Sequence, residues 1–276
     1  MQVNHLSGAG MDLHLKNHHV LITGGSKGIG LACAKVFLEE GAKVSLVSRD
    51  QATLDAAKQS LIKQIPGSGD RIAVYSADLK NAASALQALD AAEKALGPLD
   101  VLVNSAGAAK RAAAPDLKPE VWRDAMDSKF FTYINMMDPA IKRMGARGKG
   151  VVINVVGAGG KVASTLHISG GSANAALMLA SAGLAAAYAS LGVRVNAVNP
   201  AATLTERLKE GMSVTAKHEK ITEDEAMSQA TKKVPMGRLA TPEEVADTVV
   251  YLASDRASYV TGTILTMDGA AHAIVV

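Results

Sequence analysis

Short runs rich in β-branched residues alternate with longer amphipathic stretches along almost the whole chain. The short runs are continuously apolar, which is typical of strands in a sheet that is covered on both faces. The longer stretches repeat apolar residues with a helical period. Strands are expected at 19–23, 43–48, 71–76, 99–104, 150–156, 193–199 and 263–267, and helices at 28–41, 51–65, 81–96, 119–145, 171–191 and 242–253. This order predicts an α/β fold with a doubly wound sheet of about seven parallel strands and helices on both faces.

The 276 residues are expected to form a single domain, because no internal repeat or low-complexity linker divides them. We expect residues 1–11 to be a leader, either a cloning remnant or the product of an upstream start, and residues 12–276 to form the domain. Residues 204–234 are charged and too long for an ordinary connection. They are predicted to form a helical lid over the carboxyl ends of the strands, where such sheets bind ligands.

Charge and cysteine content exclude several kinds of partner. The 29 basic and 26 acidic residues give a formal charge of +3 and are scattered, so a nucleic-acid partner is not expected. No apolar run reaches the roughly 18 residues that span a bilayer, so a membrane partner is not expected either. Cys33 is the single cysteine and has no partner for an internal disulfide. These features predict a cytoplasmic protein.

A glycine-rich loop follows the first expected strand. The segment "TGGSKGIG" places Gly24, Gly28 and Gly30 between this strand and the first helix. Glycines at this spacing allow a tight turn, close approach of the backbone to a pyrophosphate, and close packing of the helix, whose N-terminus favours an anion. The loop therefore predicts a dinucleotide site, with a purely structural turn as the alternative.

The end of the second expected strand distinguishes the two nicotinamide cofactors. An acidic residue there accepts a hydrogen bond from the ribose 2′-hydroxyl, whereas a basic residue accommodates a 2′-phosphate. This chain has Ser48 at the acidic position, followed by Arg49, and Lys27 in the glycine loop is a second cation. The pattern favours NADP(H) over NAD(H). The alternative is that either base is a solvated surface charge.

Five motifs in order resemble the short-chain dehydrogenase/reductase family over residues 12–270. They are "TGGSKGIG", "ADL" at 77–79, "NSAG" at 104–107, "VRVNAVNP" at 193–200 and the segment 234–269. The resemblance implies a Rossmann-type oxidoreductase that acts on a small molecule and forms a homo-tetramer. It also implies that Asp78 contacts adenine. The cofactor-binding residues expected from the loop and the resemblance are Gly24, Ser26, Lys27, Gly28, Ile29, Gly30, Ser48, Arg49, Asp78, Leu79, Asn104, Ala106, Gly107, Pro200, Thr203 and Thr205.

The catalytic positions of the family do not match. In the family a Tyr lies four residues before a Lys and thirteen after a Ser, and an Asn follows a Trp by seven residues. Aligning "NAAL" at 174–177 with the family's Lys segment puts Asn174 at the Lys position, Gly170 at the Tyr position and Gly157 at the Ser position. Trp122 leads to Lys129 at the Asn position. All four expected residues are absent.

Two of these differences resemble an exchange. In ketoreductase domains of polyketide and fatty-acid synthases the Lys and the Asn swap places, and Lys129 with Asn174 is similar to that arrangement. The alternative for Lys129 is a lysine on a helix surface. No comparable exchange replaces the missing Tyr and Ser.

Reduction of a carbonyl develops negative charge on oxygen, and a positioned proton donor contributes about 10²–10⁴-fold to such a step. Lys129, Asn174, His167 and Ser169 are therefore the candidate catalytic residues, with Ser164 and Ser172 nearby. The imidazole of His167 has an ordinary pKa near 6.5, which suits proton transfer. The alternative is a histidine that is merely solvated in a loop.

Three functions remain open from the sequence. The first is an NADP(H)-dependent oxidoreductase with a rebuilt active site, acting on a carbonyl or an alcohol. The second is a catalytically inactive NADP(H)-binding sensor or oligomer partner. The third is a non-redox enzyme in which Lys129 or His167 moves a proton. The helix at 172–187 is rich in Ala, Ser and Gly, which predicts close packing against a partner subunit.

Overall fold

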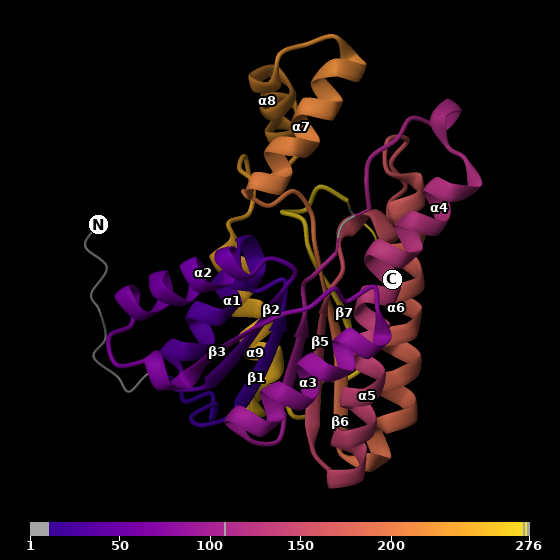
Figure 1. Cartoon of the computed structure of the whole chain (residues 1–276). Coiled ribbons are helices and arrows are strands. Elements are labelled where there is room, and N and C mark those ends of the chain that lie inside the picture. The colour runs from indigo at the N-terminus through magenta and orange to yellow at the C-terminus, as the bar shows by residue number, and fades with distance from the viewer. Residues whose placement is uncertain (1–10, 108, 273, 275–276) are drawn as a thin grey trace.

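The computed structural model of the chain describes residues 11–107, 109–272 and 274 (Figure 1). The leader predicted at 1–11 lies outside these residues except for Met11. The described chain is built on one sheet, with helices packed on both of its faces. The predicted α/β fold class is therefore confirmed.

Seven parallel strands form the sheet in the order β3-β2-β1-β4-β5-β6-β7. The chain starts at β1, builds outward to β3, and then crosses to β4 on the other side of β1. This reversal creates a switch point at the carboxyl ends of β1 and β4, where ligands bind in doubly wound sheets. The strands are β1 His19–Thr23, β2 Lys43–Ser48, β3 Ile72–Ser76, β4 Val101–Asn104, β5 Gly150–Val155, β6 Val193–Pro200 and β7 Ile264–Met267.

Helices cover the two faces of the sheet in two groups. α1, α2 and α9 pack on one face, and α3, α5 and α6 on the other, because each turns an apolar side toward the buried strands. The α-helices are α1 Gly28–Glu39, α2 Gln51–Gln64, α3 Ala82–Leu96, α4 Pro119–Ala125, α5 Thr132–Arg147, α6 Ile168–Tyr188, α7 Glu206–Glu219, α8 Glu223–Lys232 and α9 Pro242–Ala253. Short 3₁₀ turns lie at Gly69–Arg71, Ala114–Asp116, Ala158–Gly160, Ala189–Leu191 and Asp255–Ala257.

The single helix predicted at 119–145 is interrupted. A π-helical turn, Met126–Phe131, separates α4 from α5. The Thr132 hydroxyl lies within hydrogen-bond distance of the carbonyls of Ser128 (3.3 Å) and Lys129 (2.9 Å), so it compensates two groups that a wider turn leaves poorly paired. Helical periodicity does not reveal one extra residue in a turn, and this is why the sequence predicted a continuous helix.

The predicted lid contains two helices, α7 and α8, which stand over the carboxyl ends of the strands (Figure 1). They share a small apolar cluster of Met212, Ala216 and Ala226. A capping box between Thr222 and Glu225 starts α8. The helical character of the segment agrees with the sequence, and its opening and closing as a lid stay a prediction.

One helical stretch among the described residues, Ile168–Leu191, is long and apolar enough for a membrane span by length and composition, where we expected none. Most of this stretch is α6, which packs on β6 and buries Ala173, Leu177 and Ala185. A core helix of a soluble protein passes the same test, so this one helix does not indicate a membrane protein.

Candidate active site

The glycine loop between β1 and α1 fits too tightly for side chains. A Cβ on Gly24 would lie 2.9 Å from the backbone of Ala106, and a Cβ on Gly30 would collide with the carbonyl of Gly24. Gly24 and Gly28 have φ values of 67° and 54°, which favour glycine. The loop after β4 therefore packs directly on the loop after β1, at the switch point of the sheet.

The N-terminus of α1 is open for an anion. Lys27 is its N-cap residue and makes no side-chain capping bond, so the first N–H groups of α1 have no side-chain acceptor at the cap. Thr205, at the start of α7, lies beside the loop, since a Cβ on Gly28 would be 3.4 Å from its methyl group. An uncapped helix end beneath a glycine loop fits the pyrophosphate of a dinucleotide.

The carboxyl end of β2 carries the residues expected at the cofactor ribose. Ser48 is partly buried, and its hydroxyl is 3.2 Å from that of Ser26. Lys27 and Arg49, which directly follow Ser26 and Ser48 in the sequence, are both exposed. The carboxylate of Asp50 accepts a hydrogen bond from the Thr53 N–H (2.8 Å) and caps α2. This nearby acid therefore has a structural role at the start of the helix.

The other predicted cofactor residues lie along the same edge of the sheet. Asp78 is exposed, whereas Leu79 is buried. The Asn104 side chain is fully buried and donates to Asn154 (3.0 Å), so it leaves only its backbone for a cofactor. Ile29 is partly buried in the first turn of α1, Ala106 and Gly107 follow β4, Pro200 ends β6, and Thr203 lies just beyond it.

Lys129 is buried rather than exposed on a helix surface. The π-turn directs its side chain, which is 7% exposed, onto the end of β5. Its Nζ lies 2.8 Å from the hydroxyl of Tyr133 and 3.2 Å from the carbonyl of Val155. The Tyr133 hydroxyl also donates to that carbonyl (2.5 Å). Burial, and secondarily the charge of Arg207, lower the pKa of Lys129 well below its ordinary value.

Gly157 lies two residues after Val155 and faces Asn174 on α6. Gly157 has φ 126°, which favours glycine, and a Cβ on it would lie 3.2 Å from Asn174 Nδ2. The Asn174 side chain is buried, and its Oδ1 has no hydrogen-bond partner within the protein. The positions that the sequence assigned to a missing Ser and a displaced Asn therefore adjoin in space.

His167 occupies the space over Gly170. It is the N-cap residue of α6, and its ring lies where a Cβ on Gly170 would begin. Its buried Nδ1 has no partner within the protein. Burial first, and then the charges of Arg111, Arg207 and Lys129, lower the pKa of His167 to about 4, so the imidazole is neutral at pH 7. Ser169 is buried in the first turn of the same helix.

Two arginines that the sequence did not single out reach the same site. Arg207 Nη1, from α7, donates to the carbonyl of Gly107 (2.9 Å), and Arg111 Nη1 donates to the hydroxyl of Thr215 (3.1 Å). Partial burial lowers the pKa of both guanidinium groups, although each arginine residue as a whole remains solvent-exposed. Arg207 lies two residues after Thr205 in the predicted lid, and this position could have identified it as a site residue. No feature of the sequence around Arg111 indicated that it reaches the site.

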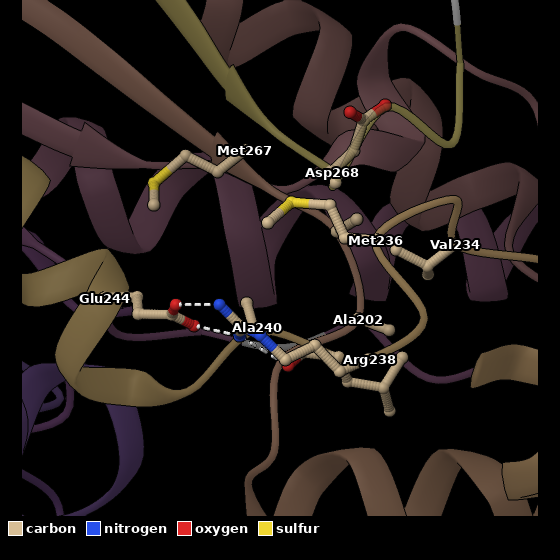
Figure 2. Close-up of a pocket in the computed structure, with 11 residues that line it drawn as sticks. Ala202, Val234, Met236, Arg238, Ala240, Glu244, Met267 and Asp268 are labelled. Atoms are coloured by element: carbon tan, nitrogen blue, oxygen red, sulfur yellow. Dashed lines mark hydrogen bonds and ion pairs between the residues drawn. The ribbon is translucent and has the colours of Figure 1, made fainter. Parts of the chain in front are cut away.

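A separate pocket lies beside the ends of β6 and β7 (Figure 2). Met236 and Met267 supply apolar surface, and Arg238 donates to both carboxylate oxygens of Glu244 (2.8 and 2.5 Å). Arg238 and Glu244 thus form an ion pair, whereas the described cations around Lys129 are not in ion pairs. No group of three His, Cys, Asp or Glu side chains in the described part of the chain is placed to hold a metal ion.

Comparisons with known proteins show what the chain is similar to over nearly its whole length. The profile of the Enoyl-(acyl carrier protein) reductase family matches residues 24–272. The chain is 33% identical to 2-(S)-hydroxypropyl-CoM dehydrogenase 3 of Xanthobacter autotrophicus, over 96% of this chain and 100% of that protein.

Solved structures of oxidoreductases also resemble the chain over nearly its whole length. L-sorbose reductase of Gluconobacter frateurii, complexed with NADPH and L-sorbose, has a TM-score of 0.88 at 27% identity, over 96% of this chain and 100% of that one. An NADPH-bound short-chain oxidoreductase of Pseudomonas aeruginosa, with an atypical catalytic center, has a TM-score of 0.84 at 26% identity, over 94% and 98%.

Proposed function

The chain belongs to the short-chain dehydrogenase/reductase family of oxidoreductases, and from this membership we propose that it interconverts a carbonyl and an alcohol with NADP(H), using Lys129 as the proton donor. The observation that carries the proposal is the buried Lys129, which bonds to the carbonyl of Val155 at the end of β5, two residues before Gly157, where the family's catalytic Ser is missing. Asn174 lies against Gly157, and both His167 and Asn174 lie against Gly159, two residues later. Ser169 is buried in the first turn of α6.

The bound cofactor would supply or accept the hydride. The ammonium of Lys129 has three N–H donors, of which two are directed to Tyr133 and Val155. The third remains for a carbonyl oxygen as negative charge develops on it. A pKa lowered by burial brings the amine toward the range in which it gives up a proton at neutral pH.

Tyr133 has a positioning role in this proposal. Its hydroxyl is fully buried and hydrogen-bonded to Val155, and burial raises its pKa. A phenol held in this state does not reach substrate, but it fixes the direction of the Lys129 amine. His167 is neutral at pH 7, so it serves as a hydrogen-bond donor or acceptor rather than as a cationic acid.

NADP(H) is the proposed cofactor because Lys27 and Arg49 follow the two hydrogen-bonded serines, Ser26 and Ser48, and both cations are exposed for a 2′-phosphate. A homo-tetramer is also proposed. Small residues and Leu179, which is 77% exposed, form the outer face of α6, and a Cβ on Gly183 would meet no atom within 4 Å. A cytoplasmic location, as the sequence predicts, completes the proposal.

The test compares wild type with Lys129→Met and Tyr133→Phe. NADPH affinity is measured by nucleotide fluorescence, and turnover by NADPH consumption over a panel of ketones, keto acids and 3-oxoacyl esters. Lys129→Met should lower turnover about 100-fold or more at unchanged NADPH affinity, because one proton donor contributes about that much. The exposed Lys63→Met serves as the matched control.

Equal turnover in wild type and Lys129→Met would contradict the role of Lys129. Tight NADPH binding without turnover of any carbonyl would favour the alternative of an inactive cofactor-binding protein. Proton exchange on a substrate without NADPH consumption would favour the non-redox alternative.

A further inference from the structure

The two arginines near Lys129 lie along one side of the lid. Arg207, Gly211 and Thr215 are spaced by four residues on α7, so they share one helix face. The guanidinium of Arg111 lies across this face, since a Cβ on Gly211 would be 3.2 Å from its Cζ, and it donates to Thr215. The glycine thus leaves room for a second guanidinium beside the first.

Both arginines act on the proposed catalytic site, Arg207 through Gly107 and Arg111 through its charge on His167. Arg207 bonds to Gly107, and a Cβ on Gly107 would be 3.4 Å from the Cα of Lys129. On the other side, the Ala112 N–H donates to the carbonyl of Leu166 (3.1 Å), which joins the segment of Arg111 to that of His167. We call Arg111, Lys129, His167 and Arg207 the basic cluster.

In the described part of the chain, no acid forms an ion pair with the basic cluster, although the charge of Glu210 on α7 acts to raise the pKa of Arg207. Among the residues that the structure describes, no carboxylate lies within ion-pair distance of Arg111, Lys129 or Arg207. Each guanidinium uses Nη1 alone in the hydrogen bonds given above and is exposed, so most of its five N–H donors remain for a ligand. Arg238 differs, because Glu244 binds its guanidinium with both carboxylate oxygens.

Unpartnered polar atoms lie at the same place. Asn174 is 6% exposed with a buried Oδ1 that has no partner, and Nδ1 of His167 is in the same condition. Buried polar atoms are normally paired, so atoms left unpaired in the protein point to a ligand. After burial, the charges of Arg111, Arg207 and Lys129 contribute to the lowered pKa of His167, and an anion would offset this accumulation of positive charge.

We infer that the substrate carries a carboxylate in addition to its reacting carbonyl or hydroxyl group, and that Arg111 and Arg207 bind this carboxylate. The inference rests on the proposed function, whose substrate class it names. A guanidinium presents a planar fork of donors that matches a carboxylate with two parallel hydrogen bonds. Because Arg207 belongs to the lid, carboxylate binding would draw α7 onto the substrate and over Lys129.

The alternative role for Arg207 is the cofactor pyrophosphate, because Thr205 lies beside Gly28 of the glycine loop. Arg111 does not share this alternative, since its described contacts are with α7 at Gly211 and Thr215. The two arginines therefore need separate variants.

Calorimetry on protein saturated with NADP⁺ tests the inference without turnover. The probes are a series of keto acids of increasing length, among them 4-oxopentanoate, each paired with its methyl ester, together with the matching keto sulfonates and inorganic phosphate. The acids should bind at least about 10-fold more tightly than their esters, because hydrogen bonds between a guanidinium and a carboxylate are stronger than those between a guanidinium and a neutral ester.

Arg111→Gln and Arg207→Gln should each abolish the preference for the acid over the ester. Lys217→Gln removes an exposed charge from the same helix and should preserve it. NADP⁺ affinity is measured in every variant. Equal binding of acids and esters, no binding of any acid, or a preference that survives both arginine variants would overturn the inference.

Two further outcomes would also overturn it. Tighter binding of sulfonates or phosphate than of every acid would assign the site to a different anion. An Arg207→Gln variant that loses NADP⁺ affinity and keeps the acid preference would assign Arg207 to the cofactor. Carboxylate binding without hydride transfer would leave the inference standing and refute the proposed reaction alone.

Discussion

Replacement of Lys129 by Met should make the protein more stable while it removes activity. Methionine has a similar length, and the substitution removes an amine that is 7% exposed and has no carboxylate within ion-pair distance in the described chain. Apolar replacements of buried ionic groups are often neutral or stabilising by about 1–4 kcal/mol. Two hydrogen bonds of Nζ are lost, each worth about 1 kcal/mol, but Tyr133 keeps its bond to Val155.

The net expectation for Lys129→Met at pH 7 is a gain of about 1 kcal/mol in the free energy of unfolding, taken from the lower part of that range. For a chain of this size, this corresponds to about 2–4 °C in Tm. The gain should shrink as the pH rises. A lysine with a depressed native pKa binds fewer protons in the native than in the unfolded state, so wild-type stability rises with pH between the two pKa values.

Urea unfolding followed by far-UV circular dichroism, at pH 7 and pH 9 and one protein concentration, measures this difference. Lys63→Met is the control and should change stability little at either pH. Destabilisation of Lys129→Met by about 2 kcal/mol or more would refute the reasoning, because it would make the amine a net contributor to the fold. A difference from wild type that does not vary with pH would refute it as well.

Three other outcomes are expected. NADPH should bind more tightly than NADH, and Arg49→Asp should reverse the preference because it replaces a partner of the 2′-phosphate by a like charge; equal affinities in the wild type would argue against Lys27 and Arg49 as phosphate ligands. Gly170→Tyr alone should destabilise the protein because the His167 ring fills its space, and His167→Ala should recover at least about 1 kcal/mol of that loss in a double-mutant cycle, whereas additive effects would contradict the packing. Light scattering should show a tetramer that Leu179→Lys dissociates, and a monomeric wild type would exclude the α6 interface.

The fold was predictable because its signals are local. Buried parallel strands are continuously apolar, and each predicted strand agrees with an observed one to within two residues at either end. The glycines of the loop after β1 are dictated by backbone contact, as the collision of a Cβ on Gly30 shows. Spacing along the chain was therefore enough to place the glycine loop at the switch point.

The substrate side of the site was only partly predictable. Fixed spacings identified Gly157, Gly170, Asn174 and Lys129, but the burial of Lys129 depends on a π-turn that periodicity does not show. The low pKa of His167 depends on burial and on charges from three other segments. Tyr133 carried a local signal in its four-residue spacing from Lys129. The burial of Lys129 and the charges around His167 arise from long-range contacts, which exist only after folding.

The most direct test of whether Lys129 assists hydride transfer is a single-turnover reaction with NADPH deuterated at C4, analysed by mass spectrometry of the product alcohol. Wild type should transfer deuterium to the carbonyl carbon of a keto acid. Lys129→Met should bind the same cofactor with unchanged affinity and transfer deuterium about 100-fold more slowly or not at all. Equal transfer rates in the two proteins, or no transfer by the wild type to any carbonyl tested, would contradict an oxidoreductase that uses Lys129 as its proton donor.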